Sequence, residues 1–177
     1  ISEGRQDLVK SIYEAYMPDF IYSKRDGQWD LKCQDIGGGF HKELGLLLST
    51  SGSTGTSRFV RLSYKNIQAN AESIVAYLGI NDTDRAVTTL PFQYSYGLSV
   101  VNTHLMMGAT LLLTDISLTE PKFWEFFKTN NPTSFAGVPY SFDLLDKIGF
   151  EDFDLPSLKY VTQAGGRLAP DRVLKYA

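Results

Sequence analysis

The sequence predicts an α/β fold in which a largely parallel sheet is flanked by helices. From Phe59 onward, short apolar runs alternate with stretches of helical periodicity, an order typical of parallel strands joined by crossover helices. Unusual loops rich in glycine, hydroxyl or aromatic side chains follow three of the predicted strands. The composition agrees, because 43% of the 177 residues are apolar and 21% are charged, as in ordinary globular domains. A chain of this length is expected to form one domain.

The first part of the chain carries fewer regular signals. Apolar residues at helical spacing predict a helix over residues 7–16, which Pro18 ends. A short strand is expected at 20–23. A polar turn follows it, and no secondary structure is predicted for the segment after this turn. Clear strands are expected at 44–48 and 59–62, on either side of a long polar loop.

The second part predicts a regular alternation. Ser63 is a good N-cap for a helix that runs to Leu78 and ends at Gly79. The further predicted strands lie at 85–90, 109–114, 133–138 and 158–162. The further predicted helices lie at 98–107, 121–129, 141–148 and 170–176.

Charge and composition exclude several classes of function. The net charge of −3 gives no basic surface for nucleic acid or for a membrane. One cysteine, Cys33, and two histidines argue against a structural zinc site, and we expect no metal ligands in this chain. Residues 1–7 are polar, and the most apolar window, 98–113, is shorter than the roughly 20 residues of a membrane span. We therefore expect a cytoplasmic protein without a membrane span.

The long polar loop is the most unusual stretch. Nine consecutive residues, Ser49 to Ser57, are serine, threonine or glycine, and Arg58 follows them. Hydroxyls, open backbone N–H groups and an arginine suit phosphate oxygens, so the loop predicts a polyphosphate clamp. A flexible linker of the same composition is the alternative. The common phosphate loop is absent, because no Gly-Lys-Ser or Gly-Lys-Thr follows Gly52 or Gly55.

Two further loops follow predicted strands, at 91–97 and 163–168. The first is compact and aromatic, and the second is centred on Gly165 and Gly166. Ligands of parallel sheets bind at the carboxyl ends of the strands, so the three loops together predict one binding site. Core aromatic residues and a tight turn remain the alternatives for these two loops.

Together the three loops resemble the AMP-forming adenylation superfamily, which contains acyl-CoA synthetases, peptide-synthetase adenylation domains and luciferases. The resemblance rests on Thr50-Ser51-Gly52-Ser53-Thr54-Gly55-Thr56, on Leu90-Pro91-Phe92-Gln93-Tyr94-Ser95-Tyr96-Gly97 and on Gln163-Ala164-Gly165-Gly166-Arg167-Leu168. The family pattern continues with Pro-Lys-Gly-Val after the first motif, where this chain has Ser57-Arg58-Phe59-Val60.

The resemblance implies a role for each motif. It implies that the ATP phosphates are bound by Thr50, Ser51, Gly52, Ser53, Thr54, Gly55, Thr56 and Arg58. It implies that adenine is bound by Ala164, Gly165, Gly166 and Arg167. The acyl pocket that it implies contains Gln93, Tyr94, Gly97 and Val138.

The resemblance also implies the reaction and the extent of the domain. A carboxylic acid would be activated by ATP and Mg²⁺ as an acyl-adenylate and passed to CoA or a carrier-protein thiol. Residues 44–177 would form the core of the AMP-binding domain, with 1–43 weakly matched. The catalytic lysine and the Mg²⁺ ligands of the family would lie beyond Ala177, so we expect this chain alone to be inactive.

Two other functions stay open at this stage. A peptide-synthetase adenylation domain normally places an acidic residue in the pocket motif, and residues 91–97 contain none, which favours an acid without an amine. A nucleotide-binding module without catalysis would bind ATP weakly and exchange no pyrophosphate. His104 falls in a helical apolar pattern and is expected to be a packed residue rather than a catalytic one.

Overall fold

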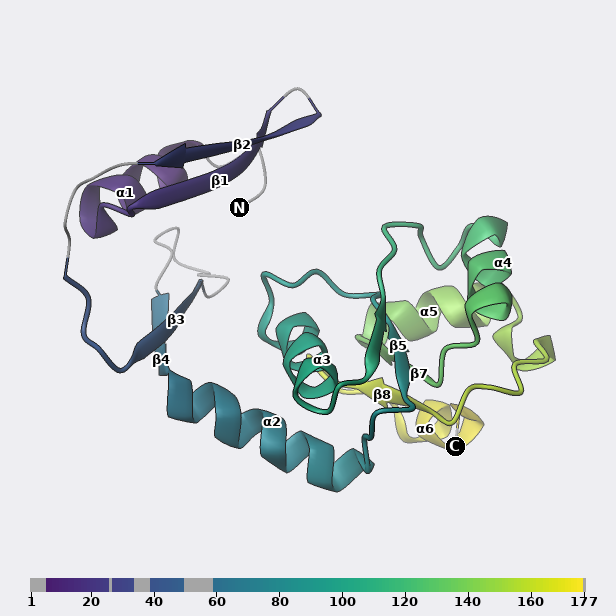
Figure 1. Cartoon of the computed structure of the whole chain (residues 1–177). Coiled ribbons are helices and arrows are strands. Elements are labelled where there is room, and N and C mark those ends of the chain that lie inside the picture. Colours follow the sequence, from purple (N-terminus) through teal and green to yellow (C-terminus); the bar gives the residue numbers. More distant parts are fainter. Residues whose placement is uncertain (1–5, 26, 34–38, 50–58, 177) are drawn as a thin grey trace. The chain divides into compact units, whose positions relative to one another are not determined.

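The computed structural model describes residues 6–25, 27–33, 39–49 and 59–176 (Figure 1). The chain divides into two compact units, residues 1–63 and 64–177. Each unit has its own sheets, and each is described separately.

The first unit contains one helix and two antiparallel strand pairs. Its elements are α1 (Gln6–Tyr16), β1 (Phe20–Arg25), β2 (Gln28–Cys33), β3 (Leu44–Ser49) and β4 (Phe59–Ser63). The predicted helix and the three predicted strands are confirmed. The sequence prediction missed β2, which pairs with β1 through a turn in which Gly27 has a φ of 80°. Trp29, Leu31 and Cys33 of β2 alternate with polar residues, so the sequence held a strand signal that the prediction overlooked, although all six residues of β2 are exposed.

The strands on either side of the phosphate-type loop form a hairpin. β3 and β4 are antiparallel, and Ser49 lies opposite Phe59 at the end of the pair that the loop connects. The sequence predicts that the strand at Phe59 begins the parallel alternation, and the structure corrects this, because the strand pairs with its predecessor along the chain. The loop itself, residues 50–58, lies outside the described residues.

The second unit is the α/β fold that the sequence predicts. Its elements are α2 (Tyr64–Leu78), β5 (Arg85–Val87), α3 (Ser95–Met106), β6 (Thr110–Leu112), α4 (Pro121–Asn130), β7 (Ser134–Gly137), α5 (Pro139–Lys147), η1 (Phe150–Asp152), β8 (Tyr160–Gln163) and α6 (Pro170–Tyr176). The four strands form one parallel sheet in the order β6-β5-β7-β8. Figure 1 shows α3 on one side of this sheet and α4 and α5 on the other.

Several boundaries differ from the prediction. β5 ends at Val87 instead of Leu90. The Thr88 N–H still donates to the Leu112 carbonyl at 3.0 Å, but the Thr114 N–H donates to the Thr88 hydroxyl at 3.1 Å and so does not continue the backbone ladder. α3 begins at Ser95, three residues earlier than predicted, so Gly97 belongs to a helix and not to the aromatic loop. α5 also begins early, at Pro139, because the Ser141 hydroxyl accepts the Val138 N–H at 3.1 Å and caps the helix.

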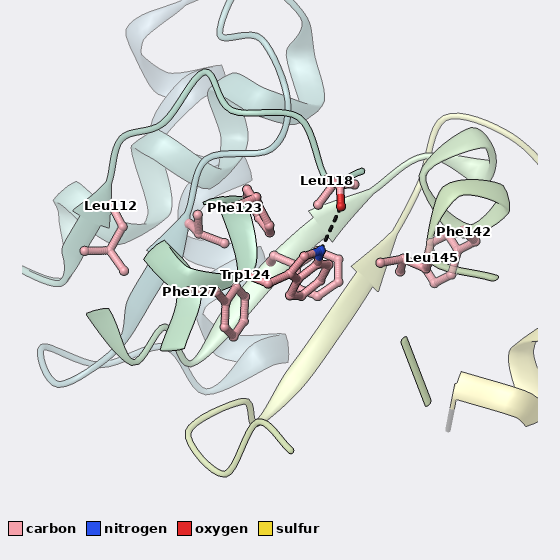
Figure 2. Close-up of a cluster of buried hydrophobic side chains, with 9 residues drawn as sticks. Leu112, Leu118, Phe123, Trp124, Phe127, Phe142 and Leu145 are labelled. Atoms are coloured by element: carbon pink, nitrogen blue, oxygen red, sulfur yellow. Dashed lines mark hydrogen bonds between the residues drawn. The ribbon is translucent and has the colours of Figure 1, made fainter. Parts of the chain in front are cut away.

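An aromatic core covers the α4 and α5 face of the sheet. Phe123 and Phe127 of α4 have no exposed surface, and they surround Trp124 with ring centroids 5.0 and 5.5 Å away. The indole N–H of Trp124 donates to the Leu118 carbonyl at 2.8 Å (Figure 2). Val87, Leu112, Phe135, Phe142 and Leu145 complete the buried cluster. This core leaves the opposite face of the sheet to α2 and α3.

Candidate functional site

The predicted site residues divide into three groups according to their place in the structure. The phosphate-binding group lies outside the described residues: Thr50, Ser51, Gly52, Ser53, Thr54, Gly55, Thr56 and Arg58. The residues predicted to bind adenine and those predicted to form the acyl pocket all lie in the second unit. Both lie near the carboxyl ends of the parallel strands, where ligands of such sheets bind.

The glycine segment after β8 forms a ledge against the start of α5. A Cβ added to Gly165 would lie 3.2 Å from Val138 Cγ1, and one added to Gly166 would lie 3.0 Å from Pro139 Cγ. Gly165 also has a φ of +84°, which L side chains rarely adopt. The segment therefore requires glycine at both positions to lie flat on Val138 and Pro139. We call residues 164–166 the glycine ledge.

Gln163 holds the glycine ledge in place. Its side-chain amide donates to the Gly166 carbonyl at 2.8 Å and to the Ala164 carbonyl at 3.1 Å. The Ala164 N–H donates to the Gly137 carbonyl at 3.3 Å, which continues the pairing of β8 with β7. The sequence prediction placed Gln163 in the loop, but it is the last residue of β8. Ala164, Gly165 and Gly166 are exposed, so their backbone can contact a flat ligand closely.

The predicted acyl residues do not share one cavity. Gln93 and Val138 line an open cavity of about 650 Å³ beside β5 and β6. Gly97 is buried in the first turn of α3, against the backbone of Pro91 and Leu90. Tyr94 is 58% exposed and precedes α3. Of these four residues, Val138 is the one that contacts the glycine ledge.

A second cavity, of about 510 Å³, begins at the glycine ledge and continues under α2 and α3. Ala164 and Gly165 line it at one end, together with Ser95 and Tyr96 of α3. Its other lining residues come from the two helices and two strands: Asn70, Ile74, Tyr77, Leu78, Ile80, Ser99, Val100, Thr103, His104, Ser134, Phe135, Ala136, Tyr160, Thr162 and Gln163. None of these described residues is acidic. We call this space the helix cavity, and its size is that of a small-molecule site.

Most polar groups of the helix cavity have partners within it. The Tyr96 hydroxyl donates to Thr162 Oγ1 at 2.8 Å and links α3 to β8. Burial raises the pKa of Tyr96 above its usual range, although the hydrogen bond with Thr162 opposes the shift. The hydroxyl of Tyr96 therefore stays protonated at neutral pH. Ser99 donates to the Tyr96 carbonyl at 2.7 Å, and Thr103 donates to the Ser99 carbonyl at 2.9 Å.

His104 is a packed residue, as expected from the sequence, but it also lines the helix cavity. Its side chain is 3% exposed, and its Nδ1 lies 2.8 Å from the Val100 carbonyl one turn earlier in α3. Burial lowers the pKa of His104, while the Val100 carbonyl and the charge of Asp84 oppose the shift less strongly. The sequence prediction did not connect His104 with a site. Tyr160 was also missed, because the apolar strand pattern around it gave no functional signal.

Comparison with known proteins decides the family. The model of the AMP-binding enzyme family matches residues 41–177, which include the glycine ledge and the helix cavity. The chain belongs to the AMP-binding enzyme family. The resemblance seen in the sequence is thereby confirmed, and the mixed α/β fold agrees with it.

Relatives in the family include two kinds of enzyme. The chain is 31% identical over 131 residues to a 2-succinylbenzoate–CoA ligase of Bacillus cereus, covering 71% of this chain and 26% of that protein. It is 26% identical over 136 residues to a linear gramicidin synthase of Brevibacillus parabrevis, covering 76% of this chain and 2% of that protein.

A solved structure shows the same fold. The N-terminal domain of FACL13 from Mycobacterium tuberculosis superposes with a TM-score of 0.67 at 20% identity, covering 78% of this chain and 36% of that domain. The chain thus spans about a quarter of the CoA ligase and about a third of this N-terminal domain. In the part of the chain that the structure describes, no helix has the length and apolar character to cross a membrane.

Proposed function

We propose that the protein containing this chain activates a carboxylic acid with ATP and transfers the acyl group to CoA or a carrier-protein thiol. The observation that carries the proposal is the junction of the glycine ledge with the mouth of the helix cavity. A flat nucleobase on the ledge and an acid in the cavity would meet at this junction. The family assignment supports the same chemistry.

The glycine ledge is the proposed adenine site. Its exposed backbone at Ala164, Gly165 and Gly166 lets a planar base approach closely. Gln163 holds the carbonyls of Ala164 and Gly166 through hydrogen bonds, so binding of a nucleobase would cost little conformational entropy in the ledge. Arg167 is exposed next to the ledge and stays a proposed contact to the nucleotide.

The helix cavity is the proposed site for the body of the acid. Tyr96 at its mouth and Val138 behind the ledge lie where the carboxylate would meet the nucleotide. Gln93, Tyr94 and Gly97 precede or begin α3, and we propose that they shape the entry side of this helix. Attack of the carboxylate on the α-phosphate would form the acyl–phosphate bond and release pyrophosphate.

The remaining parts of the proposal concern groups outside the described residues. The loop at 50–58 would hold the ATP phosphates through hydroxyls, backbone N–H groups and Arg58. Mg²⁺ would neutralise the phosphates during the displacement. We propose a cytoplasmic location, and we propose that residues 1–177 alone do not turn over.

Carboxylate-dependent exchange between ATP and labelled pyrophosphate tests the proposal. The assay uses the full-length protein with panels of acyl acids, aryl acids and amino acids. Exchange with acyl or aryl acids is the expected result. Exchange with amino acids alone would instead assign a peptide-synthetase adenylation domain. ATP binding without any exchange would assign a module that binds nucleotide without catalysis.

A matched pair of glycine variants tests the ledge. Gly165→Ala should raise the KM for ATP about 10-fold, because its Cβ pushes the ledge away from Val138. Gly108→Ala is the control, since Gly108 has a φ of +68° and open space around its Cβ position. The two variants share the backbone strain, so equal KM values for ATP would contradict a nucleotide role of the ledge.

A further inference from the structure

The helix cavity extends along β8 and α3, which line it together with α2. Gln163 is the last residue of β8, beside the glycine ledge, and we call this end of the cavity the mouth. Tyr160 is the first residue of β8 and His104 lies in the last turn of α3, and we call this other end the deep end. From Tyr160 to Gln163 an extended strand advances about 10 Å. From Ser95 to His104 an α-helix advances about 13 Å. Both elements therefore place the deep end about 10–13 Å from the mouth.

Two polar atoms at the deep end have no partner. His104 Nε2 and the Tyr160 hydroxyl are buried and make no hydrogen bond with any described residue. The charge of the buried Asp84, immediately before β5, acts to raise the pKa of both groups. Burial raises the pKa of Tyr160, and the nearby Ser134 hydroxyl opposes this shift, but the two side chains do not meet the geometry of a hydrogen bond. Buried polar groups in native proteins are nearly always paired, so these two atoms point to a ligand.

The hydrogen-bond network fixes what His104 can accept. The Val100 carbonyl can only accept, so the His104 Nδ1 that faces it at 2.8 Å carries the ring proton. The Thr103 hydroxyl, 3.2 Å from the same nitrogen, donates its own proton to the Ser99 carbonyl. Burial keeps the ring neutral by lowering its pKa. His104 Nε2 is therefore an unprotonated acceptor that needs a donor from the ligand.

The surroundings decide which donor fits. A carboxylate carries no proton and would oppose the Nε2 lone pair. A substrate ammonium would need a carboxylate partner, and no acidic residue stands among the described residues that line the cavity. A neutral hydroxyl donates to His104 and can also accept from the Tyr160 hydroxyl.

We infer that the helix cavity selects carboxylic acids that carry a hydroxyl about 10–13 Å from the carboxyl group. This inference rests on the proposed function, because it names the acid of the same site. His104 and Tyr160 act as specificity residues that bind the distal hydroxyl. A linear ω-hydroxy acid and a hydroxyaryl acid offer the same chemistry.

Paired substrates test the inference in the pyrophosphate-exchange assay. ω-Hydroxydecanoate is compared with decanoate, and 5-(4-hydroxyphenyl)pentanoate with 5-phenylpentanoate, using the full-length protein. The hydroxylated member of at least one pair should have a kcat/KM about 10- to 100-fold higher. The pair that shows the preference identifies whether the acid is linear or aromatic.

Variants connect the preference to the two residues. Tyr160→Phe removes one hydroxyl, and His104→Leu removes the acceptor, so each should reduce the preference toward equality. Tyr22→Phe is the matched control, because Tyr22 is 65% exposed and is not among the residues that line the helix cavity. Tyr160→Phe is the decisive variant should His104→Leu fail to fold, since it leaves the ring in place.

The outcomes separate this inference from the proposed function. Exchange with both members of each pair at equal kcat/KM would overturn the inference and leave the proposed function standing. A preference that survives Tyr160→Phe and His104→Leu unchanged would also overturn it. Absence of exchange with every acid would refute the proposed function itself.

Discussion

Replacing Asp84 by asparagine should destabilise the second unit strongly. Asp84 is 2% exposed, immediately before β5, and its carboxylate accepts three hydrogen bonds. The donors are Lys159 Nζ at 2.7 Å, Thr133 Oγ1 at 3.0 Å and the Asn81 N–H at 2.9 Å. Thr133 and Lys159 precede β7 and β8, so one carboxylate joins the starts of three neighbouring strands. The amide of asparagine offers one acceptor oxygen where the carboxylate offers two.

The magnitude follows from burial. Removing one partner of a buried ion pair costs about 3–5 kcal/mol, and a hydrogen bond to a charged group contributes about 1.5–3 kcal/mol. Lys159 is 50% exposed, so solvent reduces its share. We expect Asp84→Asn to lower the free energy of unfolding by about 3 kcal/mol. With a urea dependence of about 2 kcal/mol per molar, the midpoint falls by about 1.5 M.

Tryptophan fluorescence during urea unfolding measures this change. Trp124 reports the core of the second unit, and a Trp29→Phe background removes the signal of the first unit. Asp82→Asn is the matched control, because it is the same substitution at an exposed position two residues earlier in the chain. Equal midpoints for Asp84→Asn and Asp82→Asn would refute the reasoning.

The effect should also depend on pH. Burial alone would raise the pKa of Asp84, but the hydrogen bonds from Lys159, Asn81 and Thr133 together hold it below its usual range. A carboxyl with a lowered folded pKa stabilises the fold above its unfolded pKa, which is about 3.9. Its contribution is lost as the pH falls through the folded pKa. The difference in unfolding free energy between the wild type and Asp84→Asn should therefore be full near neutral pH and shrink below about pH 4.

Three further predictions concern single side chains of the second unit. Phe123→Ala should lower the free energy of unfolding by about 3–5 kcal/mol in the same urea assay, because the ring has no exposed surface, and an unchanged midpoint would contradict the core assignment. Gly97→Ala should cost about 1–3 kcal/mol although alanine favours helices, since its Cβ would overlap the Pro91 carbonyl oxygen; a gain in stability would show that α3 begins differently. Burial and a 2.7 Å hydrogen bond to Asp146 raise the pKa of Tyr176 to about 12. An ultraviolet tyrosinate titration should therefore show a late phase that Tyr176→Phe reduces by one tyrosine, and an unchanged late phase would contradict this assignment.

Much of the second unit could be predicted because its signals are local. Apolar spacing, N-caps and terminal glycines depend on residues within a few positions of each other, and they located α2, α4 and α6 closely. Boundaries failed where distant groups intervene. β5 ended early because the N–H of Thr114, 26 residues away, donates to the Thr88 hydroxyl and not to a backbone carbonyl. The antiparallel pairing of β3 with β4 also depends on a partner choice that strand periodicity does not encode.

By itself, the sequence determined the fold class, the order of the strands and α-helices of the second unit, and the glycine-centred loop that carries the family resemblance. These features depend on short contiguous motifs, in which the residue types alone indicate the local structure and the chemistry. Only the tertiary structure decided the helix cavity, because Tyr96 and Thr162 are 66 positions apart and meet across α3 and β8. It also brought His104 and Tyr160 to one end of that cavity and left one polar atom of each without a partner among the described residues. The identity of a polar atom is local, but whether it is satisfied depends on how the whole unit packs.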